Sequence, residues 1–207
     1  MSLDHARPFA FDPYSLLLLT TLLVPSLQAQ GLPPLPHIIP HACQLECCRL
    51  GEWSTSFSPL TVYAQPGDSS PPTATIPVRT SFVADSSVVV VRQFGLAVVD
   101  KPVRKRPSYI KDSSTLAPGD TVYLVKYDGE DWFTSFLHNR VDTVYAFWGL
   151  TTPGMIRPRN TPSYGRVLRS LETEWWVRVR LTNRSTGWIN MTRVGSVRGP
   201  DACSGGN

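Results

Sequence analysis

The chain has 207 residues, of which 19 are proline and 14 glycine, and charged residues make up 17% of it. An apolar fraction of 42% excludes a disordered chain, and this much proline and glycine argues against a helical bundle. The length allows one domain or two small ones. The net charge of +4 comes mainly from arginine, which outnumbers lysine 16 to 4.

The first 29 residues have the organisation of a secretory signal peptide. A short segment with Arg7 precedes an uncharged, leucine-rich run over residues 15–24, which ends at Pro25 and is followed by residues leading to Ala29. The run is shorter than the ~20 residues that span a bilayer. We therefore expect a secreted, periplasmic or cell-envelope protein that does not span the membrane once the signal is removed. An uncleaved anchor or a misplaced start are the alternatives.

The four cysteines of the chain are Cys43, Cys47, Cys48 and Cys203. An even number in an exported chain predicts two disulfides. Pairing of the adjacent Cys47 and Cys48 is disfavoured, because neighbouring Cα atoms lie ~3.8 Å apart and ordinary disulfides need ~4.4–6.8 Å. Either Cys43 bonds one of this adjacent pair while Cys203 takes the other, or Cys43 bonds Cys203 and a thiol is left over. We expect the C-terminal tail to be tied to the N-terminal segment.

A metal site is the alternative use of these cysteines, because His37 and His41 come shortly before Cys43. Structural zinc needs four nitrogen or sulfur ligands, and the spacing here matches none of the common pairs of closely spaced cysteines. The sequence therefore predicts disulfides and no metal site.

Residues 30–58 are expected to form a proline-rich, extended linker and a cysteine segment, because four prolines fall between residues 33 and 40. Short β-strands separated by turns follow, at residues 60–64, 74–83, 87–92, 96–100, 121–127 and 142–147. Asp128-Gly129 predicts a hairpin turn. Residues 149–165 are expected to form a loop, and residues 167–174 are the one stretch that could form a short helical turn. Sustained helical periodicity is missing, so the sequence predicts an all-β fold.

The clearest motif covers residues 175–194, WWVRVRLTNRSTGWINMTRV. Its alternation puts Val177, Val179 and Leu181 on one face and Arg178 and Arg180 on the other, and a polar turn leads to a return strand that starts with Gly-Trp-Ile. This pattern resembles the closing hairpin of bacterial SH3-like (SH3b) domains. Residues 60–66 resemble the first strand of such domains, and residues 115–133 resemble their middle.

The resemblance implies an SH3-like barrel over residues 60–198, either one barrel with insertions or two imperfect copies. The expected units are a first β unit at residues 59–150, a closing hairpin unit at 160–198 and a tail at 199–207. SH3-like domains bind peptides across an aromatic groove. The resemblance therefore points to a groove, at or near matching positions, formed by Tyr63, Tyr127, Trp132, Trp175 and Trp188. The competing interpretation is that Trp132, Trp176 and Trp188 fill small cores.

Residues that could carry catalysis have simpler explanations. Asp128, Glu130 and Asp131 could act as paired acids, but they flank a hairpin glycine and are typical of a solvated turn. His138 lies in a polar turn, and a cysteine peptidase would need a free thiolate. Phosphate-binding, dinucleotide-binding and calcium-binding motifs are missing from the sequence. We therefore predict no catalytic residue and no cofactor.

The basic residues between 101 and 106 and the arginines after residue 156 could bind an anionic polymer, but an exposed arginine-rich face is the favoured explanation. Nucleic acid is not an expected partner of an exported chain. The function that the sequence favours is an exported, non-enzymatic binding module for peptide, a cell-wall polymer such as peptidoglycan, or an envelope protein. The alternatives are a secreted enzyme of unknown type and a purely structural envelope component.

Overall fold

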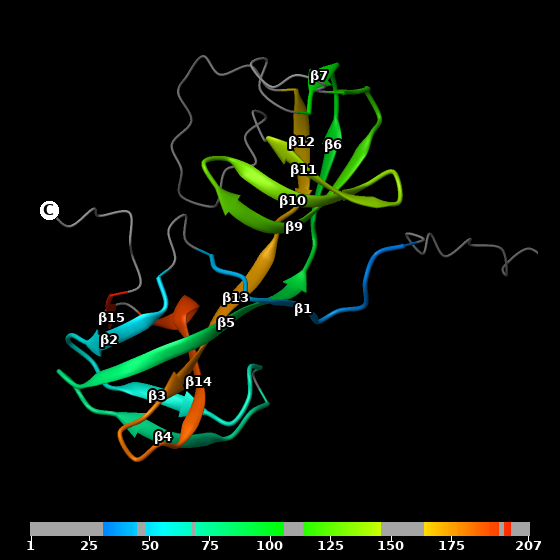
Figure 1. The fold of residues 1–207 in the computed structure, drawn as a ribbon. Helices are drawn as coiled ribbons and strands as arrows, with labels where there is room; N and C mark the ends of the chain where they lie inside the picture. The colour runs from blue at the N-terminus through cyan, green and yellow to red at the C-terminus, as the bar shows by residue number, and fades with distance from the viewer. Residues whose placement is uncertain are drawn as a thin grey trace, which may run out of the picture. The chain divides into compact units, whose positions relative to one another are not determined.

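The computed structural model describes residues 31–44, 49–67, 69–105, 114–145, 164–194 and 197–199, and within these ranges the fold is all-β (Figure 1). The only helical element in the described ranges is a single 3-10 turn, η2 (Met191–Arg193). The prediction of an all-β fold is confirmed. The predicted signal peptide, residues 1–29, lies outside the described residues.

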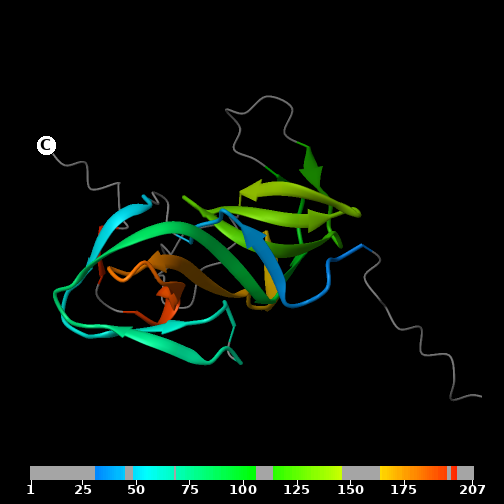
Figure 2. The same cartoon turned by 60° about the horizontal axis from the view of Figure 1, so that its bottom comes forward.

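The larger sheet has eight strands. In the order of their pairing these are β15 (Val197–Arg198), β2 (Gly51–Thr55), β5 (Ser81–Gln93), β13 (Glu172–Arg180), β14 (Thr186–Asn190), β3 (Leu60–Tyr63) and β4 (Pro72–Ile76), and β1 (His37–Pro40) pairs with β5 beside this path. Every pairing is antiparallel. The sheet curls on itself into a half-barrel (Figure 2).

The smaller sheet has five antiparallel strands, in the order β11 (Arg140–Tyr145), β10 (Trp132–Leu137), β9 (Thr121–Gly129), β6 (Gly95–Val99) and β12 (Gly165–Arg169). Two short strands, β7 (Val103–Arg104) and β8 (Thr115–Leu116), form a separate ribbon. A hairpin joins β9 to β10 as predicted, but its turn is Glu130-Asp131, because Asp128 and Gly129 end β9 and Gly129 pairs with Trp132.

Two connections pass from one sheet to the other within a few residues. Phe94 joins β5 to β6, and residues 170–171 join β12 to β13. Phe94 packs with Val91, Val125 and Phe136 in a small buried cluster that draws on strands of both sheets. Each sheet combines strands from before residue 150 with strands from after residue 160, because β5 pairs with β13 and β6 pairs with β12.

The inner face of the half-barrel holds the larger core. Val177 and Val179 of β13 point into it and are fully buried, whereas Arg178 and Arg180 point to the opposite, outer face. This confirms the alternation predicted for the closing hairpin. The other buried members of this core come from residues 42–89 and 175–189: Ala42, Trp53, Leu60, Val62, Ile76, Phe82, Ala84, Val89, Trp175 and Ile189.

The segment expected to be a linker is part of this core. Trp53 of β2 is 1% exposed, and its ring meets those of Phe82 and Trp175 edge to face at about 6 Å. The proline-rich part is extended, as expected, but it is also paired: β1 ends at Pro40 and pairs with β5, since an edge strand tolerates proline.

The prediction of a helical turn at residues 167–174 was wrong. This stretch is occupied by the end of β12 and the start of β13. Arg169 pairs with Leu96, and Glu172 pairs with Gln93. Pairing with two neighbouring strands outweighs the weak helical preference of the local sequence.

Candidate functional site

The five residues predicted to line one groove lie in three different places. Tyr63 and Trp188 are paired neighbours on β3 and β14, and both are half-buried. Trp175 points to the inner face, where it is buried in the core. Tyr127 and Trp132 belong to the smaller sheet, where their rings meet Phe133 and Tyr145. Only Tyr63 and Trp188 therefore come together, on the outer face of the larger sheet.

Beneath these two rings lies Trp176, which is 2% exposed. The Tyr63 ring meets it edge to face, with 5.5 Å between the ring centroids. Trp176 packs with Val88 and Val90 of β5, and Tyr63 and Trp188 pack against this group. We call these five residues the outer aromatic cluster. Trp176 is buried, as the competing interpretation predicts, and it forms the base of a half-exposed aromatic surface.

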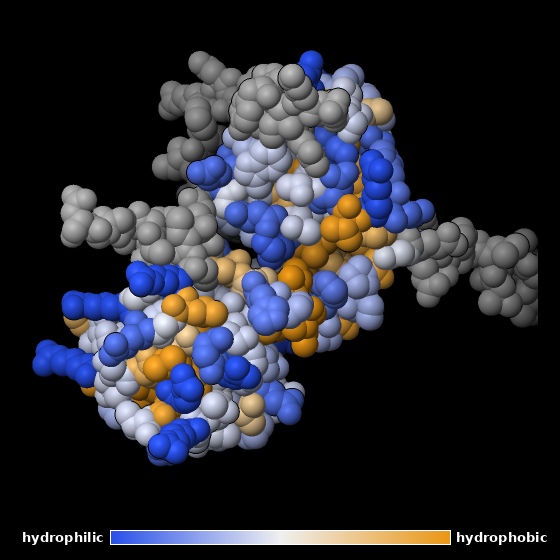
Figure 3. Space-filling view, viewed as in Figure 1, coloured by the Kyte–Doolittle hydropathy of each residue, from blue (hydrophilic) through white to orange (hydrophobic). Residues whose placement is uncertain are grey.

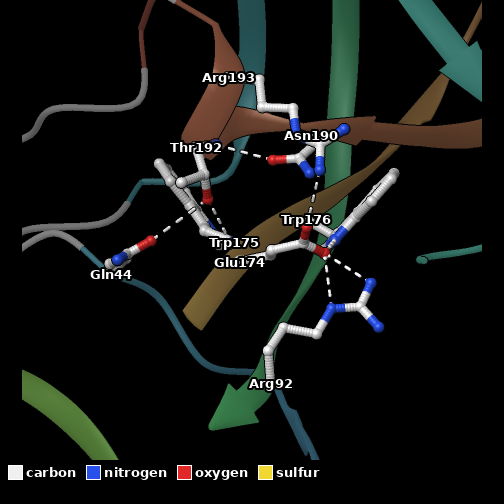
Figure 4. Close-up of polar contacts among 8 residues, drawn as sticks. All are labelled: Gln44, Arg92, Glu174, Trp175, Trp176, Asn190, Thr192 and Arg193. Carbon is white, nitrogen blue, oxygen red and sulfur yellow. Dashed lines mark hydrogen bonds and ion pairs between the residues drawn. The ribbon is translucent and has the colours of Figure 1, made fainter. Parts of the chain in front are cut away.

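A buried carboxylate adjoins the outer aromatic cluster (Figure 4). Glu174 Oε2 accepts a hydrogen bond from the Trp176 indole Nε1 at 2.9 Å. The same oxygen forms an ion pair with Arg92 Nη2 at 2.8 Å. Arg193 Nη2 approaches the other oxygen, Oε1, at 3.2 Å. Nothing in the local sequence pattern around Glu174 indicates that this acid is buried.

A pocket of about 170 Å³ lies next to this carboxylate, lined by Ser58, Pro59, Leu60, Thr61, Tyr63, Asn190, Arg193 and Val194. Asn190 is 4% exposed, and its Oδ1 accepts a hydrogen bond from the Thr192 backbone N–H at 3.0 Å. Its Nδ2 is buried and has no hydrogen-bond partner. A buried donor without an acceptor costs about 1–3 kcal/mol, so this amide is an unmet hydrogen-bonding group beside the pocket.

The residues weighed for catalysis are turn residues. Asp128 is held by Lys126 and by the Thr134 hydroxyl, which donates at 2.7 Å. His138 Nε2 lies 3.2 Å from Asp120 Oδ1 and is exposed. Glu130 and Asp131 form the exposed β9–β10 turn, both with positive φ.

Three observations concern other expectations and hold for the described ranges only. These ranges hold no group of three or more histidine, cysteine or acidic residues that could bind a metal ion. They include no helix with the length and apolar character needed to cross a membrane. The described ranges contain no free cysteine, and Cys47, Cys48 and Cys203 lie outside them, so the two disulfides stay a prediction.

Two members of the basic cluster at residues 101–106 differ in their exposure to solvent. Arg104 is exposed, whereas Lys105 is 6% exposed and forms an ion pair of 2.5 Å with Asp142. Over the larger sheet, hydrophilic side chains surround smaller apolar patches on the face seen in Figure 3.

The chain matches no protein-family model, no curated protein and no solved structure. The candidate site therefore has to be interpreted from its own geometry.

Proposed function

We propose that the chain is an exported, non-enzymatic binding module of the SH3-like kind, which holds an extended peptide against Tyr63 and Trp188. The observation that supports this is the build of the outer aromatic cluster. Two half-buried rings stand on a fully buried tryptophan whose indole N–H is held by Glu174. Rings fixed in this way offer contact area with little loss of conformational entropy on binding.

The adjoining pocket favours peptide among the expected ligands. An extended peptide presents a carbonyl oxygen at every residue, and the Asn190 Nδ2 donor lacks an acceptor. Arg193, whose side chain is 63% exposed, lines the same pocket. Movement of this long side chain would let a peptide carbonyl reach Asn190. Peptide stems of a cell-wall polymer and exposed segments of an envelope protein both carry this chemistry.

The experiment measures tryptophan fluorescence of the oxidised chain during titration with a panel of proline-containing decapeptides and with soluble peptidoglycan fragments. Trp188→Ala removes an exposed ring of the cluster, and we expect it to weaken binding by about tenfold or more. The matched control is Trp132→Ala, which removes another half-buried tryptophan, on β10 of the smaller sheet.

Binding that Trp188→Ala and Trp132→Ala weaken equally would contradict the proposed site. Saturable binding to none of the probes would contradict the binding function and favour a structural role in the envelope. Turnover of the peptidoglycan fragments by the wild-type chain would favour the enzyme alternative.

The proposal includes a disulfide clasp between the N- and C-terminal segments. The described ranges contain no free cysteine, which supports it, and so does the pairing of β15, which ends at Arg198, with β2. Peptide mapping of the unreduced chain tests it. A cross-linked peptide that contains Cys203 and any of the other three cysteines is expected, and a Cys203 thiol that reacts with alkylating reagent before reduction would disprove the clasp.

A further inference from the structure

A second, larger pocket is formed by residues of β2, the start of β5, the end of β13 and the turn after β13. Its volume is about 670 Å³, within the range of sites that bind small molecules. Its lining residues are Glu52, Ser81, Phe82, Val83, Arg180, Leu181, Thr182 and Arg184. None of these residues belongs to the outer aromatic cluster or lines its pocket.

The strand register places two opposite charges on either side of an apolar residue. Glu52 pairs with Val83, and Val83 pairs with Arg180. Directly paired residues point to the same face of a sheet, and neighbouring strands lie about 4.8 Å apart. The Cα atoms of Glu52 and Arg180 are therefore separated by about 10 Å, with the half-buried Val83 between them.

The hairpin turn after β13 brings a second arginine to the pocket. The Arg184 backbone N–H donates to the Leu181 carbonyl at 2.9 Å, and Asn183 Oδ1 accepts hydrogen bonds from the backbone N–H and the hydroxyl of Ser185. These bonds fix the turn at which Arg184 adopts a positive φ of 66°. The pocket is thus lined by one acid from β2 and by two arginines, one from the end of β13 and one from the turn after it.

Other charged residues of the larger sheet are already held in ion pairs. Arg178, two residues before Arg180, forms an ion pair of 2.7 Å with Asp85, and Arg92 and Arg193 share Glu174. Among the residues that the structure describes, no ion pair or side-chain hydrogen bond engages Glu52, Arg180 or Arg184, and all three are exposed. Their charges are available to a ligand.

We propose that this pocket binds short peptides through both of their free termini. The α-carboxylate would lie against Arg180 and Arg184, since guanidinium groups bind carboxylates with paired hydrogen bonds. The α-ammonium group would lie against Glu52, and an apolar side chain would rest on Val83. An extended tripeptide spans about 10 Å at ~3.3–3.6 Å per residue, which is close to the separation of the Glu52 and Arg180 Cα atoms.

The test uses calorimetry with three versions of the tripeptide Ala-Leu-Ala: with free termini, N-acetylated and C-amidated. For the wild-type chain we expect each blocked version to bind about tenfold more weakly, which corresponds to about 1.4 kcal/mol per lost charge contact. Arg180→Ala should remove the difference between the free and amidated peptides. Glu52→Gln should remove the difference between the free and acetylated peptides and leave the first difference intact.

Arg104→Ala is the control, because Arg104 is an exposed arginine on β7, outside the larger sheet. It should change neither difference. Equal affinities for the three peptides, or the same effect from Arg104→Ala as from Arg180→Ala, would overturn the proposal. Trp188→Ala should leave tripeptide binding unchanged, so failure of this pocket can be told apart from failure of the aromatic site.

Discussion

Trp176 donates its indole N–H to the carboxylate of Glu174, the residue two positions before it on β13, at 2.9 Å. Both side chains lie on the outer face of the larger sheet, and both are buried. The bond holds the base of the outer aromatic cluster and joins it to Arg92 and Arg193 through one acid. The proposed ligand surface is therefore rigid at its centre and half-exposed at its rim.

Replacing this acid should destabilise the fold. Glu174→Ala leaves the indole N–H and the Arg92 guanidinium without their acceptor, and we expect the free energy of unfolding to fall by about 2–3 kcal/mol. Urea denaturation measures the loss. The control is Glu172→Ala on the same strand, an exposed residue that should change stability by less than about 0.5 kcal/mol. Equal losses of unfolding free energy in the two variants would show that the buried Glu174 contributes no more to stability than the exposed Glu172.

The segment before residue 58 should prove essential to the core. Trp53→Leu removes most of a ring that is 1% exposed and packed against two other rings, so we expect a loss of about 3 kcal/mol. Thermal unfolding followed by circular dichroism reports the change. Leu50→Ala, at a nearby exposed position, should cost under about 1 kcal/mol. A Trp53→Leu variant as stable as the wild type would mean that β2 docks only loosely.

The glycine of the Gly-Trp-Ile motif has a steric role. A Cβ atom on Gly187 would lie 2.3 Å from Val62 Cγ1 and 2.9 Å from the Tyr63 carbonyl oxygen. Since the backbone of β3 cannot move away cheaply, Gly187→Ala should destabilise the chain by about 2 kcal/mol or more. The exposed neighbour Thr186→Ala is the control for the same hairpin in denaturant titrations. A neutral Gly187→Ala would show that β3 and β14 can separate at no cost.

The buried ion pair of Lys105 with Asp142 gives a prediction for the smaller sheet. Lys105→Met removes the shorter ion pair of the Asp142 carboxylate, which Arg140 still approaches at 3.8 Å, and should cost about 2 kcal/mol, whereas adding Asp142→Leu should restore much of the stability. Denaturant titration of the single and double variants measures the coupling. The ion pair of Lys126 with Asp128 is more accessible to solvent, so Lys126→Met should cost under about 1 kcal/mol. A double variant no more stable than Lys105→Met would contradict this reasoning.

Local sequence predicted the strands well where their periodicity is strict. The alternation through Val177 and Arg178 identified β13 and its two faces, and Asp128-Gly129 indicated the β9–β10 hairpin, whose turn is formed by the next two residues. It failed where pairing overrides local preference. Pro40 closes a strand because that strand lies at an edge, and residues 167–174 are extended because β5 and β6 pair with them.

The candidate site shows the same division. Periodicity and composition identified Tyr63 and Trp188 as aromatic residues of a β surface, but they could not separate them from Trp175, which points to the opposite face. Glu174 and Glu52 are both acids on strands, yet one is buried under two arginines and the other stands exposed at a pocket.

The sequence by itself determined the all-β class, the closing hairpin and the two faces of its strand, because these follow from residue order within a few positions. Only the tertiary structure decided which aromatic rings meet, which charges are neutralised and that Trp53 belongs to the core. Those properties depend on the register between strands far apart in the chain. A shift of one residue in that register would turn every side chain to the other face.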